Sequence, residues 1–195
     1  MENPSELLPE SGDKGRDQLN NWIAVSVAIL AAFMAVTKVK DDNIVQAMLQ
    51  AKSDAVDTWN EYQSKRIKHH LLELGHDQAT AMRANAPPQS ATVLEDELKR
   101  YDSEMARYGS DEKDLQAKAR GLEDKYDALN YRDDQFDLSD AALSVSLAML
   151  AVTALTRKRW LLWTSLVFAA FGVAMGLAGL LGLPLHPNWL SKLIS

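Results

Sequence analysis

Three charge-free apolar runs constrain the fold of this chain more than any other feature of its sequence. They cover residues 20–37, 141–156 and 160–187, whereas residues 38–140 between the first two are highly polar. A helix of about 20 apolar residues crosses the roughly 30 Å of hydrocarbon in a bilayer. We therefore predict an all-α membrane protein with three transmembrane helices and a long antiparallel helical hairpin, coiled-coil-like, inserted between the first and second.

The boundaries of the predicted segments follow from these runs. We predict a disordered N-terminal tail at 1–19, transmembrane helices at 20–39, 138–156 and 160–185, the extramembrane hairpin at 40–137, and a C-terminal tail at 186–195. The third helix has the strongest signal, because Trp160 and Trp163 lie at its start, where aromatic rings favour the membrane interface. The first is predicted to be a retained helix and not a signal peptide, because the stretch before it is acidic overall.

Lys and Arg residues in short loops predict the orientation in the membrane. Arg157, Lys158 and Arg159 link the second and third apolar runs, with no acidic residue nearby. This link is therefore predicted to be cytoplasmic, which puts the hairpin on the outer side. Lys38 and Lys40, at the start of the insert, favour the opposite orientation.

A heptad repeat in the insert predicts the second helix of the hairpin. One series of large apolar residues is Leu94, Tyr101, Tyr108, Leu115, Leu122, Leu129 and Phe136, and its companion four residues later is Leu98, Met105, Glu112, Ala119, Tyr126 and Asp133. Alternating spacings of four and three define a left-handed helical seam. The first series continues into Leu143 and Leu150, which suggests one helix from the insert into the membrane. Glu112 and Asp133 weaken the seam, so packing against a helix of the same chain is favoured over a parallel dimer.

The partner helix is predicted within residues 41–85, which contain no proline. Pro87-Pro88 is the clear helix breaker and predicts a turn near 85–90. The pair divides the insert into two arms of 49 residues, 38–86 and 89–137. Equal arms would place Tyr62 opposite Glu112 and Trp59 opposite Leu115.

The stretch from Trp59 to Leu71 contains the pattern W-x-x-Y-Q-x-K-x-I-K-x-H-L. It resembles the pattern of a bacterial family catalogued as domain of unknown function 4337, in which it follows a first transmembrane helix and a short Asp/Asn-rich link. Residues 41–43 (Asp-Asp-Asn) take the place of that link here. The resemblance extends to the layout of nearly the whole chain. It implies a bacterial, membrane-bound protein, and it implies no activity. Together with the orientation predicted from the Lys and Arg residues, this gives a multi-pass protein of the bacterial inner membrane with its hairpin on the periplasmic side.

Three groups of residues are candidates for sites. A hairpin-packing or recognition cluster consists of Trp59, Tyr62, Gln63, Lys65 and Lys68, and a membrane helix-packing face consists of Gly172, Gly176 and Gly179. Closely spaced small residues allow helices to approach each other, within one chain or between chains. His69, Glu73 and His76 share one helix face and form a weak metal candidate, but no fourth ligand is evident. We therefore predict no metal and no cofactor.

Composition excludes several classes of function. The insert from Lys38 to Asp140 carries 15 basic and 22 acidic residues, which disfavours nucleic-acid binding. The chain has no cysteine for thiolate chemistry. It also lacks a phosphate-binding loop and a nucleophile elbow, so we predict no enzyme. The apolar runs contain no Asp, Glu, Lys or Arg, which disfavours a transporter.

Two functions agree with this pattern. The first is a membrane-anchored helical-hairpin scaffold or interaction protein that self-associates in the lipid bilayer and docks an unidentified protein on its hairpin. The alternative is an oligomeric channel in which the hairpins form a vestibule. Its pore would use hydroxyl groups such as those of Ser26, Ser144, Ser146 and Thr153, although hydrogen bonding within its own helix is the default expectation for each of these.

Overall fold

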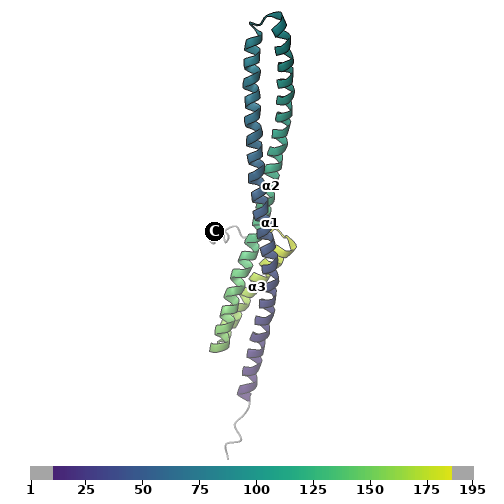
Figure 1. The fold of residues 1–195 in the computed structure, drawn as a ribbon. Helices are drawn as coiled ribbons and strands as arrows, with labels where there is room; N and C mark the ends of the chain where they lie inside the picture. Colours follow the sequence, from purple (N-terminus) through teal and green to yellow (C-terminus); the bar gives the residue numbers. More distant parts are fainter. Residues whose placement is uncertain (1–10, 186–195) are drawn as a thin grey trace, which may run out of the picture. The chain divides into compact units, whose positions relative to one another are not determined.

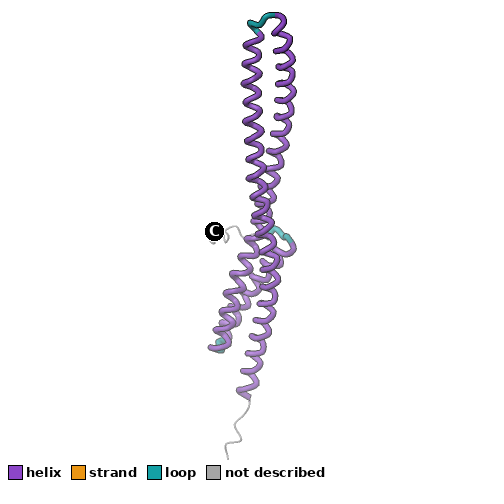
Figure 2. The backbone as a smooth tube through the Cα atoms, in the orientation of Figure 1, coloured by secondary structure: helices purple, strands orange, loops and turns teal. Residues whose placement is uncertain are grey.

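The computed structural model describes residues 11–185, and these form three α-helices. Helix α1 spans Ser11–Arg83, α2 spans Pro88–Thr156 and α3 spans Arg159–Leu181 (Figure 1). The described part of the chain contains no strand (Figure 2). Each helix has a stretch that is long and apolar enough to cross a membrane. The predicted all-helical fold is therefore confirmed, while residues 1–10 and the predicted tail at 186–195 lie outside the described residues.

Helices α1 and α2 each continue from an apolar stretch into a polar one without a break. No glycine or proline occurs between residues 16 and 74, so nothing in the sequence interrupts α1 there. Helix α1 already begins at Ser11, and it therefore includes part of the stretch 1–19 that the sequence predicts to be disordered. The chain reverses at residues 84–87, and Pro88 occupies the first position of α2, where its missing N–H costs no hydrogen bond.

The chain divides into two compact units. The arm consists of Ala47–Ala128 and contains the facing parts of α1 and α2. The apolar bundle consists of the described residues before 47 and after 128, and it contains the remaining parts of α1 and α2 together with α3. The core of the bundle is formed by buried Ile23, Leu30, Leu143, Leu150 and Ala169.

Helices α2 and α3 are joined by polar side chains at intervals of seven along α2. Each donates a hydrogen bond to a backbone carbonyl of α3: Arg132 to Gly179 (2.9 Å), Ser139 to Gly172 (2.8 Å) and Ser146 to Ser165 (2.8 Å). The acceptors are also seven residues apart and run in the opposite direction, so the two helices pack antiparallel with one register throughout. Such bonds are effective where water is scarce, because few other partners compete for the hydroxyl groups.

Helix α3 ends earlier than the predicted boundary at 185. Gly182 adopts a left-handed conformation (φ 67°), and its N–H donates to the carbonyl of Ala178. A glycine in this conformation is a common helix terminator because it has no Cβ to clash. Gln135, which is fully buried, then donates from Nε2 to the carbonyls of Leu183 and Leu185 at 2.8 and 2.7 Å.

Candidate functional site

Polar side chains pair α1 with α2 along the whole arm. The pairs are Trp59 Nε1 with Glu123 (2.8 Å), Lys65 with Asp111 (2.7 Å), His69 with Glu112 (2.8 Å), His76 with Asp102 (3.5 Å) and Arg83 with Glu95 (3.2 Å). In each pair the residue of α1 is a donor or a base and the residue of α2 is acidic. From the first pair to the last, residue numbers rise from 59 to 83 on α1 and fall from 123 to 95 on α2, so the arm is an antiparallel hairpin.

The residues of the predicted recognition cluster do not share one environment: some pack between α1 and α2, and others face the solvent. Trp59 and Tyr62 form an edge-to-face aromatic pair, with ring centroids 5.4 Å apart. Lys65 pairs with Asp111 and also lies over the ring of Tyr108, at 5.3 Å from its centroid. The other two members, Gln63 and Lys68, are exposed. The cluster is therefore not one surface: three members pack in the arm and two face the solvent.

The partners of the aromatic pair differ from those predicted by counting from the turn. Glu112 bonds His69 and not Tyr62, and Trp59 bonds Glu123, which lies eight residues beyond the predicted Leu115. Counting residues gives the approximate height along the hairpin but not the face that each side chain occupies. Glu112 in the seam therefore has a basic partner, His69, in place of the predicted Tyr62.

The residues of the weak metal candidate point to separate partners. His69 bonds Glu112, Glu73 bonds His70 at 2.7 Å, and the nearest atoms of His69 and Glu73 are 3.9 Å apart. His76 lies beside Asp102 of α2. Within residues 11–185, no group of three or more His, Cys, Asp or Glu side chains is arranged to hold a metal ion.

Removing the partner of His69 is expected to destabilise the arm. The side chains of His69 and Glu112 are only 22% and 17% exposed, so Glu112→Ala leaves a half-buried imidazole without its hydrogen bond. We expect a loss of about 1–2 kcal/mol in the free energy of unfolding. The double variant His69→Leu/Glu112→Leu is expected to match the wild type or exceed it, because no polar group is left unpaired. Thermal unfolding in detergent measures both, and an equal loss in the double variant would contradict this account.

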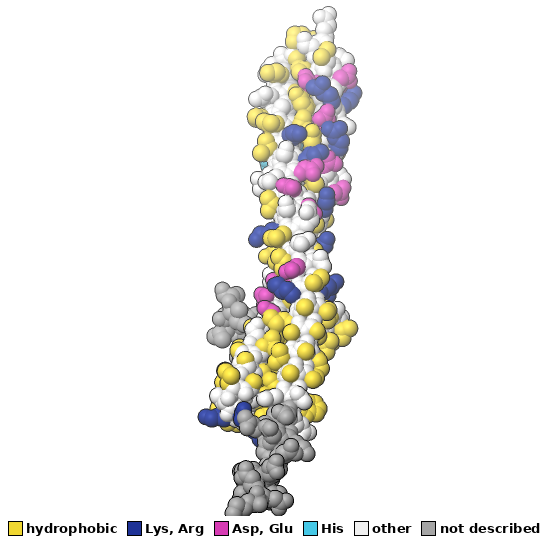
Figure 3. Space-filling model, turned by 60° about the horizontal axis from the view of Figure 1, so that its bottom comes forward, with side chains coloured by type: hydrophobic (Ala, Val, Ile, Leu, Met, Phe, Trp, Pro, Cys, Tyr) yellow, Lys and Arg dark blue, Asp and Glu magenta, His cyan; other side chains and the backbone are white. Residues whose placement is uncertain are grey.

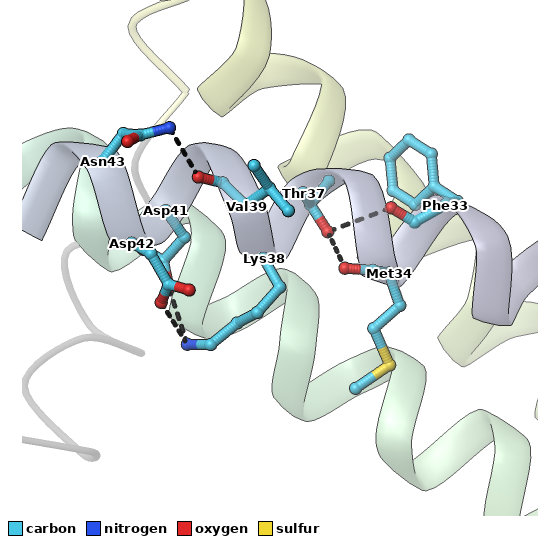
Figure 4. Close-up of polar contacts among 8 residues, drawn as sticks. All are labelled: Phe33, Met34, Thr37, Lys38, Val39, Asp41, Asp42 and Asn43. Atoms are coloured by element: carbon cyan, nitrogen blue, oxygen red, sulfur yellow. Dashed lines mark hydrogen bonds and ion pairs between the residues drawn. The ribbon is translucent and has the colours of Figure 1, made fainter.

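Acidic side chains from α1 and α2 meet in the apolar bundle. Asp41 of α1 is 4% exposed, and its Oδ2 accepts a hydrogen bond from Lys38 Nζ at 2.9 Å (Figure 4). Its Oδ1 has no conventional donor within reach. The carboxyl group of Asp133 on α2 lies within hydrogen-bonding distance of Asp41, and Asp137 is close to both. Two carboxylates can share such a bond only when one of them is protonated.

Proton binding is therefore favoured at this carboxyl pair. Partial burial, the hydrogen bond to Asp41 and the charge of Asp137 raise the pKa of Asp133 to about 6. Partial burial and the charge of Asp41 also raise the pKa of Asp137. From its sequence position, Asp133 is predicted to lie in the helical seam, and Asp41 belongs to the Asp-Asp-Asn link. The position of Asp133 in the seam was the one signal that this carboxyl group faces another helix.

The glycine face of α3 packs against helices of the same chain. A Cβ atom at Gly172 would lie 2.8 Å from Leu143 Cγ, and one at Gly179 would lie 2.9 Å from the ring of Phe136. At Gly176 it would meet Ser139 Oγ at 2.7 Å and the ring of Phe33, which belongs to α1, at 2.8 Å. The sequence left open whether this face packs within or between chains. In the structure α1 and α2 occupy it.

A comparison with known protein families identifies the family of this chain. The family model described as "Domain of unknown function (DUF4337)" matches residues 19–182. The chain belongs to this family. The match includes the apolar stretches of all three helices and the whole arm. Searches of curated proteins and of solved structures found no match.

Proposed function

We propose that this DUF4337 protein is a membrane-anchored helical scaffold whose arm is an interaction surface for proteins. The observation that carries the proposal is that the arm, Ala47–Ala128, is a compact unit of its own. Because its two helices pair their polar side chains with each other, its outer surface is free to bind a partner. The three apolar stretches would supply the anchor.

We place the anchor in the inner membrane of a bacterium and the arm in the periplasm. The link between α2 and α3 is short and basic, and it is followed by Arg159 at the start of α3. Positive loops of this kind are retained in the cytoplasm, which favours an outward-facing arm. Ser110 is exposed on the arm, and a Ser110→Cys variant that fails to react with an impermeant maleimide from outside would contradict this orientation.

The channel alternative draws less support from the described residues. Of the four hydroxyl groups considered for a pore, those of Ser146 and Thr153 are fully buried and donate hydrogen bonds within the chain, whereas Ser144 is exposed and Ser26 is partly exposed. Ser146 was expected to bond within its own helix by default, but it bonds across to α3. The fully buried side chains of Ser146 and Thr153 cannot line a pore in this packing of the helices, so the channel alternative depends on Ser26 and Ser144.

We also propose that the chain self-associates, but not through the two surfaces that the sequence suggested. The sequence prediction depended on the heptad seam and on the glycine face of α3. Within the described residues, the seam pairs α2 with α1 of the same chain, and the glycine face packs against α1 and α2. A contact between copies must therefore use a different surface.

In-cell photo-crosslinking tests the proposed scaffold. A photo-reactive amino acid placed at Lys68 or Ser103, which are exposed on α1 and α2 of the arm, is expected to give discrete adducts with another protein chain. The matched control is Val167, which is 69% exposed in the apolar stretch of α3 and is expected to face lipid. Absence of adducts from every arm position tested would contradict the scaffold. Ion flux through reconstituted liposomes would favour the channel instead.

A further inference from the structure

Large apolar side chains are exposed on one helix of the arm. Six of them, each between 53% and 64% exposed, belong to α1: Leu49, Val56, Ile67, Leu71, Leu74 and Met82. On the α2 part of the arm only Val93 is comparable among the described residues. Large apolar side chains that gather on an exposed surface usually mark an interaction site. We call these six residues the α1 stripe.

The α1 stripe follows one side of the helix, and the exposed polar residues Ser53, Asn60, Ser64 and Gln78 lie on the same side. At 3.6 residues per turn its six members fall within a sector of about 80° of the helix circumference. Leu49 and Val56 are seven residues apart, while Val56 and Ile67, and Leu71 and Met82, are separated by 11. An 11-residue spacing keeps side chains on one side of a nearly straight helix, as required for a long contact between two helices.

Charge is concentrated on the other helix of the arm. From Ala47 to Arg83, α1 has five Lys or Arg and five Asp or Glu residues. From Pro88 to Ala128, α2 has seven basic and eleven acidic residues. Figure 3 shows charged side chains gathered mostly on one side of the arm and hydrophobic ones along the other. Two arms that approach through α2 would repel each other, whereas two that approach through α1 bring together neutral apolar surfaces.

We propose that the α1 stripe binds the α1 stripe of a second copy of this chain, with the two helices parallel. This inference rests on the proposed scaffold function, and it identifies a second copy of the chain as a partner of the arm. A symmetric pair of this kind needs only one self-complementary surface, and residues on its axis meet their own counterparts. The pairing would cover the exposed apolar side chains of both arms and leave both acidic α2 helices facing the solvent.

The membrane determines the direction of this pairing. Copies inserted with the same topology present their arms on the same side, so their α1 helices run parallel with equivalent residues at equal heights. Asn60 lies in the α1 stripe, 11 residues from both Leu49 and Leu71, and it is exposed. An asparagine in the contact between two parallel helices can pair with its counterpart and fix their register.

Disulfide crosslinking tests the inference directly, because the natural chain has no cysteine. Single variants Val56→Cys, Ile67→Cys and Leu71→Cys, made in the full chain and oxidised in native membranes, are expected to form dimers on non-reducing gels. Ser103→Cys and Ser110→Cys, exposed on α2, are the matched controls. We expect roughly ten-fold more dimer from the α1 stripe, since a disulfide needs Cβ atoms about 4 Å apart. Equal yields at all five positions, or no dimer from the α1 stripe, would overturn the inference.

A mass measurement in gentle detergent adds a second test. Ile67→Glu places a charge in the centre of the α1 stripe and is expected to convert a dimer into monomers, whereas Ser103→Glu leaves the dimer intact. A wild-type monomer would overturn the inference, and so would a dimer that survives Ile67→Glu. If arm positions crosslink to a different protein and never to a second copy, the inference fails and the scaffold function stands. If the arm gives no adduct at all, both fail.

Discussion

Gly172→Leu is expected to unfold at a much lower temperature than the wild-type chain. Even a Cβ at this position would lie 2.8 Å from Leu143 Cγ and 3.1 Å from the backbone oxygen of Ser139. Leu143 is fully buried and the oxygen belongs to a helix, so neither can move aside. Helix α3 would have to move away from α2, which breaks the hydrogen bonds from Ser139 and Ser146. We expect a loss of about 3 kcal/mol in the free energy of unfolding.

Gly121→Leu is the matched control for this substitution. Gly121 is also inside a helix, but a Cβ there has no neighbour within 4 Å. Leucine has a higher helix propensity than glycine, so this variant is expected to gain up to about 1 kcal/mol. Thermal unfolding followed by circular dichroism in detergent compares the two. Similar unfolding temperatures for the two variants would show that α3 does not pack on α2 through Gly172.

Asp133→Asn is expected to stabilise the protein near neutral pH and to have no effect in acid. The pKa of Asp133 is raised from 3.8 to about 6 in the folded chain, so the folded state holds this proton more tightly than the unfolded state does. The contribution of Asp133 to stability is therefore greatest below its ordinary pKa, and it is lost as the pH rises through about 6. Asparagine stays neutral and can donate to Asp41 at every pH. At pH 7.5 the variant thus keeps a neutral side chain that can donate to Asp41, whereas the wild type has such a side chain only at low pH.

Unfolding temperatures at pH 4.5 and pH 7.5 test this prediction. The difference between Asp133→Asn and the wild type should be positive at the higher pH and close to zero at the lower one. Asp124→Asn, which removes an exposed carboxylate from the same helix, is expected to change neither value. A constant difference at both pH values would mean that Asp133 does not bind a proton in the folded chain within this range.

The helices and their faces could be predicted from local patterns. The charge-free runs coincide with the apolar stretches of the three helices, and Pro87-Pro88 lies where the chain reverses. The first heptad series predicts one face of α2, and its later members Phe136, Leu143 and Leu150 are at most 2% exposed. Periodicity succeeds here because a helix repeats its faces every 3.6 residues whatever it packs against.

The identity of partners across helices could not be predicted in the same way. Equal arms suggested Leu115 for Trp59, but the indole bonds Glu123. Glu112 looked unfavourable in the seam, yet His69 lies opposite and bonds it. The stagger between two helices depends on how their side chains fit together, and small differences accumulate along helices of this length.

The sequence by itself determined that this chain forms three helices with apolar stretches and a long polar hairpin, because composition and periodicity act locally. It also determined the membership of the DUF4337 family, through residues spread over most of the chain. Only the tertiary structure brought Asp41 to Asp133 and placed Leu143 against Gly172. It also left Leu49, Val56 and Ile67 exposed on the arm. These relations depend on how helices distant in sequence approach each other, which no local pattern encodes.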